Sequence, residues 1–174
     1  VMMEVIKRAG IESSDVGQVV GGCINKIGAQ AMNITRTAWL SHGGAQEVAA
    51  TTIDAQCGSS QQAVNQAHAL IASGIEDVVL ACGVEAMSLL PIGSDAFAGK
   101  QAGLGSPMSR TYFGHYEFIS QFDGAERIAN KYEITREDTD RFGLQSQERA
   151  AVAIAEGRFE TQVIPIEAPV LDAD

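Results

Sequence analysis

A single cysteine stands where two sequence patterns meet, at a place where its thiol could act as a nucleophile. Cys57 follows the apolar stretch 48–55 and comes just before a helical pattern that begins near Ser60. A strand that turns directly into a helix leaves backbone N–H groups and the positive end of the helix dipole at the turn. Such a place favours the thiolate, the reactive form of cysteine. The position therefore suits a nucleophile that accepts an acyl group and passes it on.

The alternative role for Cys57 is packing, because free cysteine is among the residue types most often buried. Its neighbours Gly58, Ser59 and Ser60 favour the chemical role, since small residues leave room for a substrate close to the backbone. We expect Ser59 and Ser60 to cap the helix or to line the pocket wall, and not to act as catalysts.

The amino-acid composition limits the kinds of partner that the chain could bind. The chain has 174 residues, the size of one domain, and carries 12 Lys and Arg against 22 Asp and Glu, a net charge of -10. Nucleic acid is excluded as a partner, because phosphate binding needs a basic surface. A ligand with a nucleotide tail could still bind through a local patch of Arg or Lys.

The cysteines and the apolar runs indicate whether the chain binds a metal ion, forms disulfides or spans a membrane. Cys23, Cys57 and Cys82 form no short metal-ligand spacing, and their odd number argues against a disulfide framework. We therefore expect reduced thiols in a cytoplasmic protein, with no metal ion. Apolar runs such as 78–82 are too short to span a bilayer, and no targeting segment is visible.

The periodicity predicts an α/β fold. Helical patterns cover about 2–9, the stretch after the predicted cap Asn33, and 60–71, and they alternate with strand-like runs. The strands are expected at 18–23, 48–55 and 78–82, and the apolar run 48–55 is expected to be a buried strand. Strand, helix and strand at this spacing form a crossover, which predicts parallel strands in one sheet. The third helix is expected to bury a broad face, with His68 between its members: Ala63, Val64, Ala67, Leu70 and Ile71.

The later part of the chain has a different character. The stretch 88–116 is rich in Gly, Ser, Pro and aromatic residues without a sustained period, which predicts a long irregular segment. Helical pattern resumes near 125–132. Thr135 and Asp138 form a capping-box signature, which predicts a long helix through Ala155. A strand is expected at 162–166.

Five segments together carry a resemblance to a known family. In chain order they read Asp-Ala-Gln-Cys-Gly-Ser-Ser-Gln-Gln-Ala at 54–63, Ala-Cys-Gly-Val-Glu-Ala-Met-Ser at 81–88, Gly-Ala-Glu-Arg-Ile-Ala at 124–129, Ile-Thr-Arg-Glu-Asp at 134–138 and Glu-Gly-Arg-Phe at 156–159. In this order they strongly resemble the thiolase family of acetyl-CoA C-acyltransferases, over nearly the whole chain. The version around Cys57 is similar to actinobacterial thiolases of lipid or steroid side-chain breakdown.

The resemblance implies a fold and a reaction. Residues 1–117 would form the α/β core of the N-terminal domain, with a doubly wound sheet, and 118–174 would begin the loop domain that covers CoA. Cys57 would attack the ketone carbon of a 3-ketoacyl-CoA, release acetyl-CoA and hold the acyl group as a thioester until a second CoA takes it. Its own backbone N–H would help to bind the oxyanion. The turn that contains Glu85, Met87 and Ser88 would give structural support.

The departures from the family concern the catalytic base and the pocket. Members of the family are much longer and carry, in their later half, an Asn-Glu-Ala turn, a Gly-His-Pro histidine and a second reactive cysteine, none of which this chain contains. The family's first strand is also missing. Where many members have His-Met beside the pantetheine arm, this chain has Ser120 and Gln121. We expect these two residues and His115 to contact substrate, and His42 and His68 to be structural.

The resemblance therefore implies an incomplete part of a thiolase-type acyltransferase, inactive when isolated. The parent reaction would be thiolytic cleavage of 3-ketoacyl-CoA or condensation of acetyl-CoA. CoA would be a substrate, no cofactor would be permanently bound, and the intact parent would be a homodimer or homotetramer. Two alternatives stay open: a ketoacyl synthase or non-thiolytic thiolase-like protein, and a non-catalytic fragment that binds acyl-CoA or a partner chain.

Overall fold

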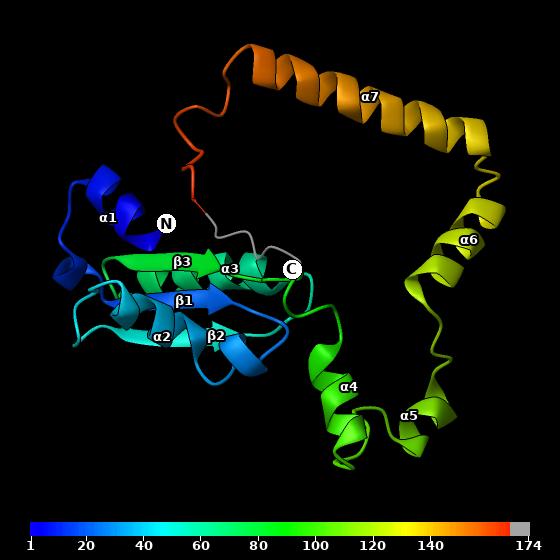
Figure 1. The fold of residues 1–174 in the computed structure, drawn as a ribbon, viewed down its shortest axis with the longest axis horizontal. Coiled ribbons are helices and arrows are strands. Elements are labelled where there is room, and N and C mark those ends of the chain that lie inside the picture. The colour runs from blue at the N-terminus through cyan, green and yellow to red at the C-terminus, as the bar shows by residue number, and fades with distance from the viewer. Residues whose placement is uncertain (168–174) are drawn as a thin grey trace, which may run out of the picture. The chain divides into compact units, whose positions relative to one another are not determined.

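The computed structural model describes residues 1–167, and the chain divides into two compact units, one from Val1 to Pro107 and one that begins at Met108 (Figure 1). The domain boundary expected from the sequence, between residues 117 and 118, stays a prediction about the family's domains. The compact units divide earlier, so His115 belongs to the second unit.

A parallel sheet forms the centre of the first unit. Its three strands lie in the order β2-β1-β3, and both outer strands pair in parallel with β1. Their bounds are β1 Gln18–Gly22, β2 Ala49–Ile53 and β3 Val79–Gly83. The helices of this unit are α1 Met2–Ala9, α2 Ile34–Ser41, α3 Ser59–Ala72 and α4 Ser94–Gln101. The predicted crossover is confirmed, since α3 connects two strands that both pair with β1.

Side chains along β1 show that helices cover both faces of the sheet. Val19 lies in the hydrophobic core with Ile6 of α1 and Trp39 of α2. Gly21, two residues later in the strand, faces the same side of the sheet, and a Cβ there would meet Thr35 of α2. On the other face a Cβ at Gly22 would meet the first turn of α3. The predicted doubly wound fold is therefore confirmed, with α2 and α3 on opposite faces (Figure 1).

The second helix is held at both ends by contacts that its sequence explains. The Asn33 side chain accepts a hydrogen bond from the Arg36 N–H, as the predicted cap requires. Trp39 is fully buried, and its indole N–H donates to the Ala45 carbonyl at 2.9 Å. A Cβ at Gly44 would lie 2.3 Å from the Trp39 ring, so only glycine allows the chain to pass there.

Two predictions of burial were wrong. The stretch 48–55 was expected to be a buried strand, but most side chains of β2 are exposed or half-buried, because β2 is the edge of the described sheet. The buried face of α3 is narrow and consists of small residues, Ala63 and Ala67, so that the helix lies close to the strands. Val64 is 52% exposed, and His68 is exposed instead of lying within the core.

The segment 88–116, expected to be irregular, contains α4 and a short helix α5 Arg110–His115. Local capping explains the second of these, because the Ser109 side chain accepts a hydrogen bond from the Tyr112 N–H. Neither helix was predicted, because the glycine and aromatic residues of this segment do not follow a regular helical period.

The second unit consists mainly of two more helices, α6 Gln121–Lys131 and α7 Arg136–Ala155. Both begin with a capping box, formed by Ser120 with Asp123 and by Thr135 with Asp138, so the predicted start of the long helix is confirmed. The prediction of a strand at 162–166 is wrong. These residues form no strand, and the second unit has no strand among its described residues to pair with them.

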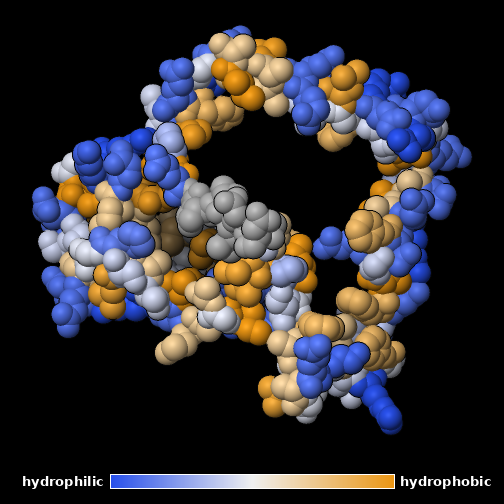
Figure 2. Space-filling view, in the orientation of Figure 1, coloured by the Kyte–Doolittle hydropathy of each residue, from blue (hydrophilic) through white to orange (hydrophobic). Residues whose placement is uncertain are grey.

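Apolar side chains lie exposed on both units (Figure 2). In the helices of the second unit, within the described residues, Ala153 is the one buried side chain, while Phe142 and Ile154 are mostly exposed. Along residues 1–167, no helix is both long and apolar enough to cross a membrane.

We expect the substitution Gly22→Ala to destabilise the protein by about 1–3 kcal/mol, the usual cost of overpacking. The new methyl would lie 2.6 Å from the Ser60 backbone nitrogen, so α3 itself would have to move. Gly99→Ala is the matched control, because nothing lies within 4 Å of a Cβ at that position in α4. Urea unfolding measures both, and equal stability of Gly22→Ala and wild type would contradict the packing described here.

Candidate active site

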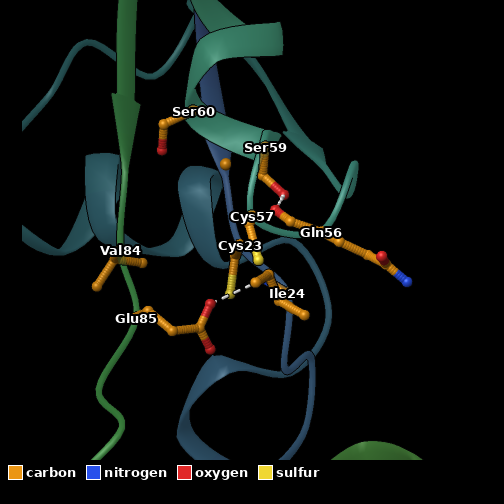
Figure 3. A pocket seen from close by; sticks show the side chains of 9 residues that line it. Cys23, Ile24, Gln56, Cys57, Ser59, Ser60, Val84 and Glu85 are labelled. Carbon is orange, nitrogen blue, oxygen red and sulfur yellow. Dashed lines mark hydrogen bonds between the residues drawn. The ribbon is translucent and has the colours of Figure 1, made fainter. Parts of the chain in front are cut away.

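The carboxyl ends of the three strands surround one cavity of about 220 Å³. In parallel α/β folds ligands bind in this region, where connections leave the central strand in opposite directions. The lining comes from the segment after each strand and from the start of α3: Gly22, Cys23 and Ile24; Gln56, Cys57, Ser59 and Ser60; and Val84 and Glu85 (Figure 3).

Cys57 lies where the sequence predicted it, immediately before the helix cap Gly58 and the first residue of α3. It is an exposed free cysteine and lines the cavity. The helix that follows spans 14 residues, so its N-terminal amides and dipole face the turn that carries the thiol. A substrate carbonyl in the cavity could therefore meet both a thiol and a helix N-terminus.

Ser59 braces this turn. Ser59 and Ser60 both line the cavity, as expected, but neither caps α3, whose cap residue is Gly58 and has no side-chain cap hydrogen bond. The Ser59 hydroxyl accepts a hydrogen bond from the Ala55 N–H at 3.0 Å and donates to the Gln56 carbonyl (Figure 3). The side chain is buried, and both hydrogen bonds stay within the turn. Ser59 thus stabilises the backbone around Cys57.

Glu85 forms the opposite wall and connects two loops. Its carboxylate accepts hydrogen bonds from the Ile24 N–H at 2.9 Å, from the Asn25 N–H at 3.2 Å, and from the side-chain amides of Asn25 and Gln30 at 3.1 and 2.8 Å. Partial burial opposes its ionisation, but these hydrogen bonds together hold the pKa of Glu85 below its usual range. The structural support expected of this residue has its physical basis in these contacts.

Asn25 and Gln30 belong to the site and were missed by the sequence analysis. Both are almost fully buried. The Asn25 side-chain oxygen accepts from the Gly93 N–H at 3.2 Å, and that of Gln30 accepts from the Ala86 N–H at 2.6 Å. The available signal was the presence of two amide side chains soon after a buried strand, in a segment that otherwise reads as a loop.

The other two cysteines differ from Cys57 in exposure. Cys23 lines the same cavity but is buried, and burial together with the charge of Glu85 raises the pKa of its thiol. Cys82 is half-buried, and burial raises its pKa too. Both thiols therefore favour the protonated form, which is a poor nucleophile. Of the three cysteines, only Cys57 is exposed, and it lies at the N-terminus of α3.

The three residues expected to bind substrate lie in the second unit. Ser120 is the cap of α6, Gln121 is the first residue of that helix, and His115 is the last residue of α5, 6.3 Å from Tyr116 between ring centroids. All three are exposed. Cys57 lies in the first unit, and the role of these three residues in substrate binding stays a prediction.

The remaining candidates have local roles. His42 ends α2 and is exposed, with its ring Nδ1 3.1 Å from the Ala38 carbonyl, which fits the expected structural role. Met87 and Ser88 are exposed. Within the described part of the chain, no group of three His, Cys, Asp or Glu side chains could hold a metal ion.

Comparison with known proteins agrees with this geometry. The family described as "Thiolase, N-terminal domain" matches residues 1–174. The chain belongs to the thiolase family. Its solved neighbours include an acetyl-CoA acetyltransferase from Bacillus anthracis, with a TM-score of 0.72 and 31% identity, and the match covers 97% of this chain and 44% of that one.

Curated relatives include two bacterial members of the thiolase family. The steroid 3-ketoacyl-CoA thiolase FadA6 of Mycobacterium tuberculosis is 43% identical over 94% of this chain. The acetyl-CoA acetyltransferase of Syntrophomonas wolfei is 36% identical over 95% of it. This thiolase chain spans only 41% and 43% of the length of those two relatives.

We expect Glu85→Gln to lower the free energy of unfolding at pH 7 by about 1–3 kcal/mol, because an amide cannot accept from all the donors around this carboxylate. The low pKa of Glu85 also sets a pH dependence. Its stabilisation is complete above the unfolded value, about 4.3, and is lost as pH falls through the lower folded value.

Urea unfolding at pH 7 and at pH 3.5 tests this expectation. Wild type should lose more stability between the two pH values than Glu85→Gln does. Glu76→Gln, another carboxylate of the first unit, serves as the control for loss of charge. A variant with the stability and acid sensitivity of wild type would show that Glu85 does not hold the two loops.

Proposed function

We propose that this chain supplies the nucleophile of a thiolase-type acyltransferase that acts on 3-ketoacyl-CoA, and that Cys57 is that nucleophile. One observation carries the proposal: Cys57 is an exposed thiol at the N-terminus of α3, within a cavity at the carboxyl ends of three parallel strands. Membership of the thiolase family supports the reaction class.

The proposed reaction has two transfers. The Cys57 thiolate attacks the C3 ketone carbon, and the C2–C3 bond breaks as the oxyanion collapses. Acetyl-CoA leaves as its enolate and takes up a proton, while the shortened acyl group stays on Cys57 as a thioester. A second CoA thiol loses its proton to a base and attacks this thioester, which forms the new acyl-CoA and restores the Cys57 thiolate. In the reverse direction the same steps condense acetyl-CoA with an acyl group.

The site supports the first transfer through its electrostatics. The backbone N–H of Cys57, at the start of the helix, is proposed to help stabilise the oxyanion. Hydrogen bonds to Glu85 hold the loops of the opposite wall together, and burial and the charge of Glu85 raise the pKa of Cys23, the other thiol that lines the cavity. The base is proposed to lie outside this chain, because the family's Gly-His-Pro histidine has no counterpart in the sequence.

The finer features of the function follow from the resemblance and are proposals as well. Ser120, Gln121 and His115 would contact the acyl-CoA substrate. CoA would enter as a substrate and not as a bound cofactor. The name of the Mycobacterium tuberculosis relative supports a substrate from lipid or steroid breakdown. A cytoplasmic homodimer or homotetramer is proposed for the whole protein, and the exposed apolar side chains are consistent with further contacts.

We expect incubation with acetoacetyl-CoA to acylate Cys57. Mass spectrometry of the digested protein locates the adduct, and Cys57→Ala should remove it. This variant should cost less than about 1 kcal/mol in stability, because removing an exposed thiol leaves little cavity. Cys82→Ala is the matched control and should acylate normally. An adduct on Cys23 or Cys82 with none on Cys57 would overturn the assignment.

We also expect residues 1–174 alone to show no steady-state thiolysis, because no residue of the chain matches the family's base or its second cysteine. Loss of the absorbance of the 3-ketoacyl-CoA enolate is the measurement. Turnover that survives Cys57→Ala would point to contamination, whereas turnover that requires Cys57 would place the base within this chain, with His115 the first residue to replace. Capture without turnover also separates this proposal from a fragment that only binds acyl-CoA.

A further inference from the structure

The residue before the nucleophile has a strained backbone. Gln56 has φ of 51°, in the left-handed region that side chains other than glycine rarely adopt. Such conformations cost of order 1–3 kcal/mol and persist only where surrounding contacts hold them. Gln56 is exposed, so packing in the core does not hold it. Specific hydrogen bonds must therefore do so.

Asp54 provides the first of these contacts. Its Oδ1 accepts a hydrogen bond from the Gln56 N–H at 2.8 Å. Its Oδ2 forms an ion pair with the Lys26 ammonium at 3.0 Å, and Lys26 also donates to the Ile24 carbonyl at 3.4 Å. Through Lys26, Asp54 ties the turn after β2 to the loop after β1, whose Ile24 lines the cavity.

The other side of the turn is held by α3. The Ser59 hydroxyl bonds to the backbone of Ala55 and Gln56, and the Ser59 N–H donates to the Gln56 carbonyl at 2.9 Å. The Gly58 N–H donates to the Ala55 carbonyl at 3.1 Å. The peptide groups on both sides of Gln56 are thus fixed, one by Asp54 and one by Ser59.

We propose that Asp54, oriented by Lys26, is a positioning residue that holds Gln56 in the left-handed conformation and thereby sets the direction in which Cys57 presents its thiol. Without this contact the peptide before Cys57 relaxes to a commoner conformation, and the thiol turns away from the substrate carbonyl. Misplacement of a reacting group by about 1 Å can cost about a hundredfold in rate.

The ionisation of Asp54 agrees with this role. The hydrogen bond from the Gln56 N–H, followed by the contact with Lys26, holds the pKa of Asp54 below its usual range against the opposing effect of burial. A charged acceptor makes a stronger hydrogen bond to an amide than a neutral one does. The carboxylate is therefore suited to hold a strained peptide in an exposed turn.

The test measures two reactions of Cys57 in the same set of variants. One is alkylation by iodoacetamide, followed by intact mass and site mapping, which needs no acyl-CoA. The other is acylation by acetoacetyl-CoA, which rests on the proposed function. Asp54→Ala should slow both by about tenfold, the effect of losing one hydrogen bond to a charged group. Asp54→Asn keeps an acceptor for the Gln56 N–H but loses the ion pair with Lys26, so it should slow both reactions less than Asp54→Ala does, by about twofold to fivefold.

Rescue separates positioning from general stability. Glycine adopts the left-handed conformation without strain, so Gln56→Gly added to Asp54→Ala should restore the alkylation rate to within about threefold of wild type. Asp77→Ala removes another exposed carboxylate of the first unit and should change neither reaction. Lys26→Met removes the ion pair with Asp54 and the hydrogen bond to the Ile24 carbonyl, and it should slow alkylation by about twofold to fivefold, the usual range for an exposed pair.

The outcomes are distinct. Unchanged rates in Asp54→Ala, or a slow reaction that Gln56→Gly does not restore, would overturn the positioning role. If Asp54→Ala does not fold, the Lys26→Met variant tests the proposal in its place. Wild-type rates in that variant would overturn the part assigned to the Lys26 pair. Normal alkylation of Cys57 without acylation in wild type would overturn the proposed function, while the alkylation series would still decide the role of Asp54.

Discussion

The close approach of the N-terminus of α3 to the end of β1 is the constraint on which the site depends. Gly22 makes it possible, because any Cβ there would meet the backbone of Ser59 and Ser60. Gly83 on the neighbouring strand leaves space for the Ser60 side chain in the same way. With the helix held against the strand ends, its N-terminal amides face the cavity, and the residue before the cap, Cys57, lies at the cavity wall.

The two walls of the cavity differ: one carries the exposed thiol, and the other holds the loops together. On one side an exposed thiol lies on a strained turn that Asp54 and Ser59 hold. On the other side Glu85 accepts four hydrogen bonds and keeps the loops after β1 and β3 together. Burial raises the pKa of the Cys23 thiol, and the neighbouring Glu85 carboxylate, whose own pKa is lowered by its hydrogen bonds against the effect of burial, raises it further. Of the two thiols that line the cavity, only that of Cys57 is exposed.

Both units expose large apolar side chains in the described residues. The helices of the second unit carry strong caps, with capping boxes at Ser120 and Thr135, yet they bury few of their own apolar side chains. Local signals therefore define these helices independently of a core. This fits a chain that spans less than half the length of its relatives in the thiolase family.

The sequence by itself determined α1, α2, α3 and the three strands of the first unit, the parallel crossover, the caps at Asn33 and Thr135, and the place of Cys57 before α3. These features depend on neighbours a few residues apart, and periodicity and capping report such neighbours directly. The tertiary structure decided which faces are covered. Val64 and Ile71 look like core residues but are exposed, because α3 packs through its alanines.

Tertiary structure also decided the partners of Glu85, which come from Asn25 and Gln30 more than fifty residues earlier in the chain. The left-handed conformation of Gln56 also depends on tertiary contacts, since nothing in a glutamine side chain favours it. Contacts between distant segments, such as that of Lys26 with Asp54, are set by strand register, and only the folded sheet fixes that register.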